Sequence, residues 1–277
     1  MAQLLPTADF CGIRMSRLII GGNPFSGNSH VSHEMDEAMR DYYSTANIKQ
    51  ALHRCVACGI NTVQLRADQH IMRILREFRL EGGKLNWIAQ TASEVANFAG
   101  NIRQISADPS AVAIYHHGSV TDNLYQAGKI DELKERLKIM RASGLPVGLG
   151  THKPEVIRLC EAEQWDVDFY MACVYDLART QRISSALTGI ANTDEPFDEA
   201  DIPIMYETIR STSKPTLAFK IMGATRRCAT ASDVKANFAE AFRNIKSNDC
   251  VIVGVFQRDK DQIAENSRFV REVLAPD

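Results

Sequence analysis

The sequence shows no membrane-spanning apolar run, no signal-peptide pattern and no basic block of the kind that binds nucleic acid. No stretch reaches about 18 uninterrupted apolar residues, and residues 1–14 do not show the basic-then-apolar order of a signal peptide. There is no basic block, because 32 Lys and Arg are balanced by 34 Asp and Glu, with a formal net charge of −2. We therefore expect a cytoplasmic protein that binds a small molecule rather than nucleic acid or a membrane.

Cysteine is present, but the number and spacing of the cysteines do not indicate a disulfide framework. The seven cysteines are an odd number at irregular spacing, and most lie in apolar runs where a thiol packs as a small hydrophobic group. Cys55 and Cys58 form a Cys-x-x-Cys motif within the helical pattern Ile48 to Cys58, but no second pair follows at the spacing of a zinc ribbon. We predict reduced thiols and two packed helix cysteines.

What the sequence does contain is a repeated alternation of short apolar runs and helix-length stretches. Continuous apolarity is typical of strands that are buried on both faces, and the stretches between the runs supply parallel crossovers. With 277 residues, the chain is predicted to form a single (β/α)₈ TIM-barrel domain over residues 1–277. The rival, an open doubly wound sheet, lacks its Gly-x-Gly-x-x-Gly motif after the first run. The runs are Arg17–Gly21, Asn61–Leu65, Asn86–Gln90, Ala111–Tyr115, Pro146–Gly150, Val167–Val174, Pro215–Ile221 and Cys250–Val255.

Two connections are too long and too polar to be tight turns. We expect long loops after the first strand, over about 23–43, and after the sixth strand, over about 180–201. In a barrel, both loops lie on the face formed by the carboxyl ends of the strands, which is where barrel enzymes carry their active sites. The second loop could cover such a site.

Polar side chains collect at the predicted strand ends, where they would face the mouth of the barrel. Some have structural alternatives: Gln64 and Gln90 could bridge buried backbone groups, and Arg66 could pair with Asp68 at the surface. Tyr175, which follows the sixth strand, is a candidate catalytic residue, as is Arg66, a clamp for an anion or a carbonyl oxygen. The set contains Asn23, His30, Gln64, Arg66, Asp68, Gln90, His116, His117, His152, Tyr175, Asp176, Lys220, Gln257 and Arg258.

The pair His116-His117 is the strongest local signal. Adjacent residues at a strand end point to opposite sides, so one imidazole is expected to face the barrel and the other a neighbouring helix or loop. Lys220 is the second signal, because it ends an apolar run in which an ammonium group needs a carboxylate, a phosphate or a substrate carbonyl. The structural alternative for Lys220 is a salt bridge, to Asp176 or Glu207.

The order of these elements resembles the aldo-keto reductase superfamily through most of the chain. Ala111-Val-Ala-Ile-Tyr-His-His-Gly118 is similar to that family's fourth strand, which ends in a His, and the segment 141–155 is similar to its fifth strand and turn. The segment 253–266 resembles the family's cofactor-phosphate segment. The resemblance implies that NADP binds through Gly254, Gln257, Arg258, Gln262, Glu265 and Asn266. A helix that begins near Asp259–Gln262 would offer free N–H groups to a phosphate.

The chain departs from the family at the residues that perform the reduction. Of the family's Asp, Tyr, Lys and His, only the His is matched, by His117. Gln64 stands at the expected Asp, Asp68 lies near the expected Tyr, and Gln90 stands at the expected Lys. Thr151-His152 replaces the family's Ser-Asn, which grips the nicotinamide, and Met171 replaces its Gln. Without the usual phenol, the proton donor would have to be Tyr42, Tyr43, Tyr115 or Tyr175.

Three functions remain open from the sequence. The first is an aldo-keto-reductase-like enzyme that acts on a small polar carbonyl or sugar-like substrate, with NADP and an unconventional acid. The second is a cofactor-independent lyase, isomerase or hydrolase that uses His116 or His117 as the base and Lys220 as an electrophile or Schiff-base amine, with a metal-binding variant on His30, His116, His117 and His152. The third is a catalytically inactive barrel that binds a small ligand. Pocket residues are expected at Asn23, Gln64, Asp68, Gln90 and His152.

Overall fold

The computed structural model describes residues 4–179, 183, 185–190 and 192–275. Its centre is a closed barrel of parallel strands in the order β10-β3-β4-β5-β6-β7-β8-β9. The predicted (β/α)₈ barrel is confirmed, and each barrel strand overlaps the apolar run that predicted it. The strands are β3 (Leu18–Gly21), β4 (Thr62–Arg66), β5 (Asn86–Gln90), β6 (Ala111–His116), β7 (Val147–Thr151), β8 (Phe169–Cys173), β9 (Thr216–Phe219) and β10 (Cys250–Gly254).

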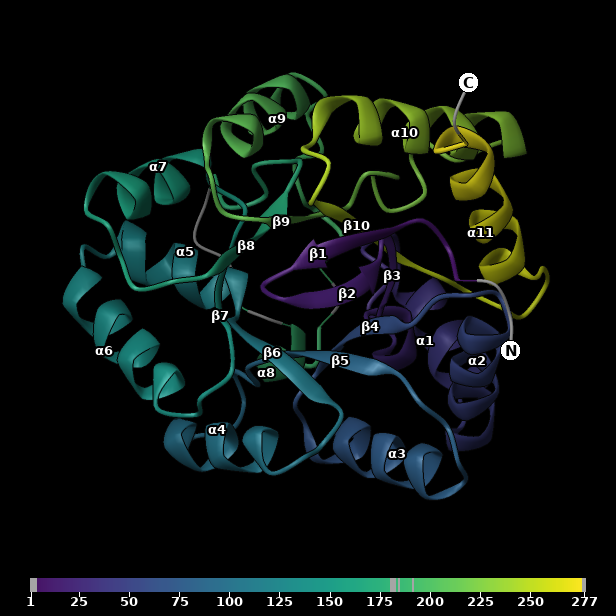
Figure 1. The fold of residues 1–277 in the computed structure, drawn as a ribbon, viewed down its shortest axis with the longest axis horizontal. Helices are drawn as coiled ribbons and strands as arrows, with labels where there is room; N and C mark the ends of the chain where they lie inside the picture. Colours follow the sequence, from purple (N-terminus) through teal and green to yellow (C-terminus); the bar gives the residue numbers. More distant parts are fainter. Residues whose placement is uncertain (1–3, 180–182, 184, 191, 276–277) are drawn as a thin grey trace.

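Helices form a ring around the strands (Figure 1). The helices of the described residues, including those in the connections at one end of the barrel, are η1 (Pro24–Ser26), α1 (His33–Tyr42), α2 (Thr45–Ala57), α3 (Gln69–Leu80), α4 (Phe98–Ser106), α5 (Gly118–Gln126), α6 (Ile130–Arg141), α7 (Pro154–Ala162), α8 (Ser185–Thr188), α9 (Asp201–Ser211), α10 (Ala231–Asn244) and α11 (Gln262–Val273). Within the described ranges, no helix combines the length and the apolar character that a membrane crossing needs. Cys55 is buried in α2 and both cysteines of the Cys-x-x-Cys motif are free thiols.

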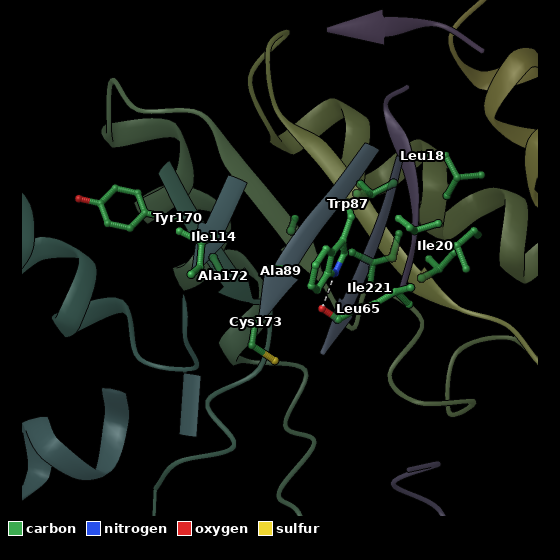
Figure 2. Close-up of a cluster of buried hydrophobic side chains, with 14 of the residues drawn as sticks. Leu18, Ile20, Leu65, Trp87, Ala89, Ile114, Tyr170, Ala172, Cys173 and Ile221 are labelled. Atoms are coloured by element: carbon green, nitrogen blue, oxygen red, sulfur yellow. Dashed lines mark hydrogen bonds between the residues drawn. The ribbon is translucent and has the colours of Figure 1, made fainter. Parts of the chain in front are cut away.

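The strands bury one set of side chains against the helices and the other set inside the barrel. The outward set, with Ile20, Leu65, Trp87 and Ile114, belongs to one large cluster under the helices. Figure 2 shows part of this layer, in which the indole N–H of Trp87 donates to the backbone carbonyl of Leu65 at 3.0 Å. The inward set forms a second cluster along the barrel axis. This alternation follows from the pleat of a strand, and it decides which polar residues can face the mouth.

An N-terminal hairpin, which the sequence analysis did not predict, closes one end of the barrel. Its strands β1 (Thr7–Phe10) and β2 (Ile13–Ser16) pair antiparallel and lie across the barrel end that faces the viewer in Figure 1. Phe10 and Met15 are fully buried among the inward residues, and the ring of Phe10 meets the ring of Phe169 at 5.0 Å. Because Phe169 begins β8, the hairpin closes the end formed by the amino ends of the strands.

The opposite end, formed by the carboxyl ends of the strands, carries two long connections. The connection after β3 contains η1 and α1, and the connection after β8, residues 174–200, contains α8. The two meet where the hydroxyl of Ser185 donates to the side-chain oxygen of Asn28 at 2.6 Å. The barrel therefore has a hydrophobic plug at one end and a polar, loop-covered mouth at the other.

We predict that Phe10 stabilises the barrel as part of this plug. The change Phe10→Ala removes a fully buried aromatic ring and should lower the free energy of unfolding by about 3 to 5 kcal/mol. Arg14→Ala, on the exposed side of the same hairpin, should change it by less than about 0.5 kcal/mol. Urea unfolding measures both. Equal, small effects would show that the hairpin does not contribute to the barrel core.

Candidate active site

A cavity of about 410 Å³ lies at the mouth of the barrel. Its floor consists of the last inward side chains of the strands, and Gly21 and Gly150, which have no side chain, leave the space open. Gly150 also tolerates no Cβ, since that atom would lie 2.7 Å from the backbone oxygen of His116. The floor residues are Gln64, Gln90, Tyr115, Met171, Phe219 and Ile252, and the polar residues above them are Asn23, His30, Arg66, His117, His152 and Lys220.

The two adjacent histidines point to opposite sides of β6, as predicted. His117 lines the cavity, and its backbone N–H donates to the hydroxyl of Thr91 at 3.0 Å. His116 is 1% exposed and lies behind the strand, where its Nδ1 is 2.8 Å from the hydroxyl of Thr121 in α5. Burial lowers the pKa of His116 to about 3. The position of His116 does not support its predicted catalytic role, because the strand pleat turns it away from the mouth.

Arg66 lines the cavity and is held by two acids. Its guanidinium pairs with Glu94, and its Nε lies 3.5 Å from a carboxylate oxygen of Asp68. Asp68 itself caps α3, since its side chain accepts from the backbone N–H of Ile71 at 2.8 Å. Asp68 is not among the residues that line the cavity, so its expected place in the pocket is corrected to a capping and pairing role.

Lys220 belongs to a nearly buried charged cluster at the mouth. Its Nζ lies 3.2 Å from a carboxylate oxygen of Glu195, and the same oxygen lies 2.9 Å from Nδ1 of His30. The other ring nitrogen of His30 lies 3.1 Å from the amide nitrogen of Asn23. The side chains of Glu195 and Lys220 are only 4% and 8% exposed. Two connections and one strand end therefore meet at a single carboxylate.

The expected partners of Lys220, Asp176 and Glu207, are wrong. Asp176 pairs instead with Lys153 at 3.3 Å, and the connection after β8 folds back over the mouth to bring Glu195 to Lys220. The ring of Phe197 in the same connection lies 5.3 Å from Nζ of Lys220 and 4.0 Å from the guanidinium carbon of Arg226. These contacts fasten the described part of the connection to the strand-end side of the cavity.

A second buried pair lies at the end of β7. Nδ1 of His152 is 2.7 Å from a carboxylate oxygen of Asp122 in α5, and the other oxygen accepts from the hydroxyl of Thr151 at 2.5 Å. Asp122 is 0% exposed, and His152 is 5% exposed at the cavity wall. His152 is thus a pocket residue, as expected, and a buried carboxylate holds its ring.

The segment 254–266 contributes to the cavity only in part. Gly254, Gln262, Glu265 and Asn266 line it, whereas Gln257 and Arg258 do not. The helix begins at Gln262, as the sequence predicted, but its first N–H groups have acceptors within the chain: Ile263 N–H donates to the side chain of Gln257 and Ala264 N–H to that of Asp261. Arg258 is exposed and pairs with Asp259, and Lys260 pairs with Glu265. These groups do not form a ready phosphate site.

Tyr175 also lies away from the cavity. It is 1% exposed, its ring meets the ring of Phe197 at 5.0 Å, and burial raises its pKa. Of the other phenols considered as proton donors, Tyr43 donates to the backbone oxygen of Val255 at 2.7 Å, while Tyr115 lines the cavity. Burial raises the pKa of Tyr115 as well. The prediction of Tyr175 as a catalytic residue is corrected, because its ring packs under the connection after β8.

The histidines do not converge on a metal site. His116 lies on the far side of β6 from the cavity, and among the described residues no group of three or more His, Cys, Asp and Glu side chains could hold a metal ion. The metal-binding variant is therefore not supported by the arrangement of these side chains.

The barrel is similar to several solved enzymes. It superposes on 3-deoxy-D-arabino-heptulosonate 7-phosphate synthase from Thermotoga maritima with a TM-score of 0.55 and 13% identity, over 97% of this chain and 90% of that one. It superposes on the holo form of an aldo-keto reductase from Bacillus halodurans with a TM-score of 0.54 and 11% identity, over 97% and 90%. A thermostable aldo-keto reductase complexed with epalrestat gives 0.54 and 11%, over 95% and 93%.

The resemblance to aldo-keto reductases is therefore one of several likenesses between this barrel and known enzymes. No family model matches the sequence, and no curated protein matches it either. At these identities the likeness shows the fold alone, a TIM barrel of the kind found in reductases and synthases.

Sequence reasoning missed two residues of the site, Asp122 and Glu195. Asp122 is an ordinary acid within a helix until that helix is packed against β7. Glu195 is one of several acids in a long polar loop, and nothing in the loop sequence indicates which acid turns inward. The available signal was Lys220, whose ammonium group at the end of an apolar run needs a carboxylate, a phosphate or a substrate carbonyl as its partner.

We predict that His116 makes stability depend on pH. Its pKa in the fold is about 3, below the ordinary 6.5, so its contribution is complete above pH 6.5 and is lost as the pH falls towards 3. Between pH 7 and pH 5 the wild type should lose about 2 kcal/mol of unfolding free energy through this group. Urea unfolding of His116→Gln at both pH values should show a smaller loss by that amount. Equal losses in both proteins would contradict the assignment.

Proposed function

We propose that the protein is an enzyme that transfers protons on a small polar carbonyl compound, as an isomerase or lyase does, with its own side chains as acid and base. One observation supports this most directly: an imidazole and an ammonium group, His117 and Lys220, face one cavity whose floor carries the side-chain amides of Gln64 and Gln90. A volume of about 410 Å³ suits a small metabolite. The amides can bind hydroxyl and carbonyl oxygens, which favours a sugar-like substrate.

The residues divide the chemistry between them. His117 can give or take a proton at the substrate, because imidazole changes its charge near neutral pH. Lys220, which pairs as an ammonium ion with Glu195, can donate a hydrogen bond to the oxyanion that forms when a proton leaves the carbon next to a carbonyl. Arg66, the last residue of β4, is held by Glu94 and Asp68 and can bind a second oxygen of the substrate.

We predict that His117→Ala reduces proton transfer by about a hundredfold or more while the barrel stays folded. The assay follows deuterium incorporation next to the carbonyl in D₂O by NMR, with a panel of small hydroxyaldehydes and hydroxyketones. It needs no knowledge of the product. His116→Gln is the matched control, because His116 is adjacent to His117 but faces away from the cavity. This variant should keep most of the turnover. Similar losses in both variants would remove His117 from the mechanism.

A second candidate, an NADP-dependent reductase, is favoured by the continuity of the cavity with Gly254, Gln262, Glu265 and Asn266. The hydrogen-bond donors of residues 254–266 argue against this candidate. The first N–H groups of α11 already bond to Gln257 and Asp261, and Asp261 brings a negative charge to the place where a phosphate would sit. The residues therefore do not fit the cofactor phosphate, and the proposed proton transfer involves no nicotinamide.

Titration with NADP distinguishes the two candidates. Since the cations of the segment pair with Asp259 and Glu265, we expect no saturable binding tighter than about 1 mM by calorimetry. Arg258→Ala should leave the titration unchanged. Micromolar binding that disappears in Arg258→Ala would instead establish the reductase.

A further inference from the structure

The pair Asp122 and His152 has the geometry of a base held by a carboxylate. His152 is the inward residue that follows β7, and it lies at the cavity wall at 5% exposure. Its Nδ1 lies 2.7 Å from Oδ2 of Asp122, which is fully buried. A buried carboxylate is costly unless hydrogen bonds satisfy it, so its donors are part of the geometry of the pair.

The donors around Asp122 determine where His152 carries its proton. The carboxylate accepts from the hydroxyl of Thr151 at 2.5 Å and from the backbone N–H of His152 at 3.1 Å. An ionised carboxylate can only accept, so the contact with Nδ1 requires a hydrogen on Nδ1. The neutral ring then has its lone pair on Nε2, the form of imidazole that removes a proton.

The ring of His152 lies against α5 through its Nδ1 and Cε1 atoms. A Cβ at Gly118, the first residue of α5, would lie 3.3 Å from Cε1 of His152, so the edge with Nδ1 and Cε1 faces that helix. The ring of Phe219 packs against the imidazole edge to face, at 5.6 Å and 70°. The backbone hydrogen bond, the Asp122 contact and the Phe219 ring together fix the imidazole beside the cavity that it lines.

We propose that His152 is the general base of the reaction and that Asp122 is its positioning residue, an inference that rests on the proposed function. The step is a proton transfer without a redox change. Nε2 of His152 takes the proton from the carbon next to the carbonyl, and the electrons of that C–H bond form the C=C bond of an enolate. The carbonyl oxygen takes the negative charge and accepts a hydrogen bond from Lys220.

This assignment separates the tasks of two histidines at neighbouring strand ends. His117 is the N-cap of α5 and His152 follows β7, and a Cβ at Gly118, the residue after His117, would lie 3.3 Å from Cε1 of His152. The held imidazole removes the proton from carbon while His117 donates a proton to the carbonyl oxygen, so exchange at that carbon needs both histidines. Two imidazoles with different partners provide the unlike acid and base that a proton relocation needs.

The tautomer can be measured without a substrate. In protein labelled with ¹⁵N at histidine, the neutral ring of His152, assigned through its loss in His152→Gln, should carry its hydrogen on Nδ1. In Asp122→Asn, an amide N–H can donate to Nδ1, so the hydrogen should move to Nε2. Asp131→Asn, the same change at an exposed position of α6, should leave the tautomer unchanged. A wild-type ring with its hydrogen on Nε2 would overturn the inference.

Deuterium incorporation then tests the role as base. His152→Gln should lose about a thousandfold or more, and Asp122→Asn a smaller part of the rate, about a hundredfold, as expected for an imidazole in the wrong tautomer. Asp122→Glu should recover part of the rate if it restores the Nδ1 tautomer. More than half of the wild-type rate in His152→Gln would overturn the inference and leave the proposed function intact.

The two failures are distinguishable. If the wild type exchanges no proton on any carbonyl compound of the panel, the proposed function fails, and with it the role of His152 as base. In that case, an Nδ1 tautomer of His152 that reverses in Asp122→Asn would still establish that Asp122 determines which ring nitrogen carries the hydrogen.

Discussion

A strand in a closed barrel turns successive side chains to opposite sides, and this alternation places the part of the site that the strands carry. Along β6, Tyr115 and His117 face the cavity while His116 faces α5. The same alternation brings Gln64 and Gln90 to the floor from β4 and β5. Without the inward packing that fixes the register of the strands, no imidazole at the mouth would have a defined direction. The catalytic proposal thus depends on the core before it depends on any polar contact.

Charge at the mouth is compensated by carboxylates from outside the strands. Glu195 arrives from the connection after β8 and meets both His30 and Lys220, which have positive φ angles of 60° and 63°. Non-glycine residues adopt this left-handed conformation at a cost, so the contacts of Glu195 help to hold two strained backbone positions. Asp122 arrives from α5 and holds His152. Glu195 therefore holds the two connections at the mouth together, whereas Asp122 orients the imidazole ring of His152.

The barrel and the neighbourhood of the site were predictable because both follow from local patterns. Apolar runs such as Ala111–Tyr115 indicate strands directly, and the residue after a run must lie at a strand end. Contacts that depend on loop paths or on helix packing were not predictable. Lys220 indicated a partner for an ammonium group, but the pairing with Glu195 depends on the path of a long connection, and neither Asp176 nor Glu207, the carboxylates expected, is that partner. The hairpin that carries Phe10 was missed because its strands alternate polar and apolar residues and lack the continuous apolar runs that indicated the barrel strands.

The plug formed by Phe10 and Met15 has a consequence for traffic through the barrel. With the amino end filled by apolar side chains, a ligand would reach the cavity at the carboxyl end of the barrel and would leave by the same end. In the proposed enzyme, release of one product would therefore precede binding of the next substrate at that end. The rate of the proposed reaction would then depend on product release as well as on the proton transfers.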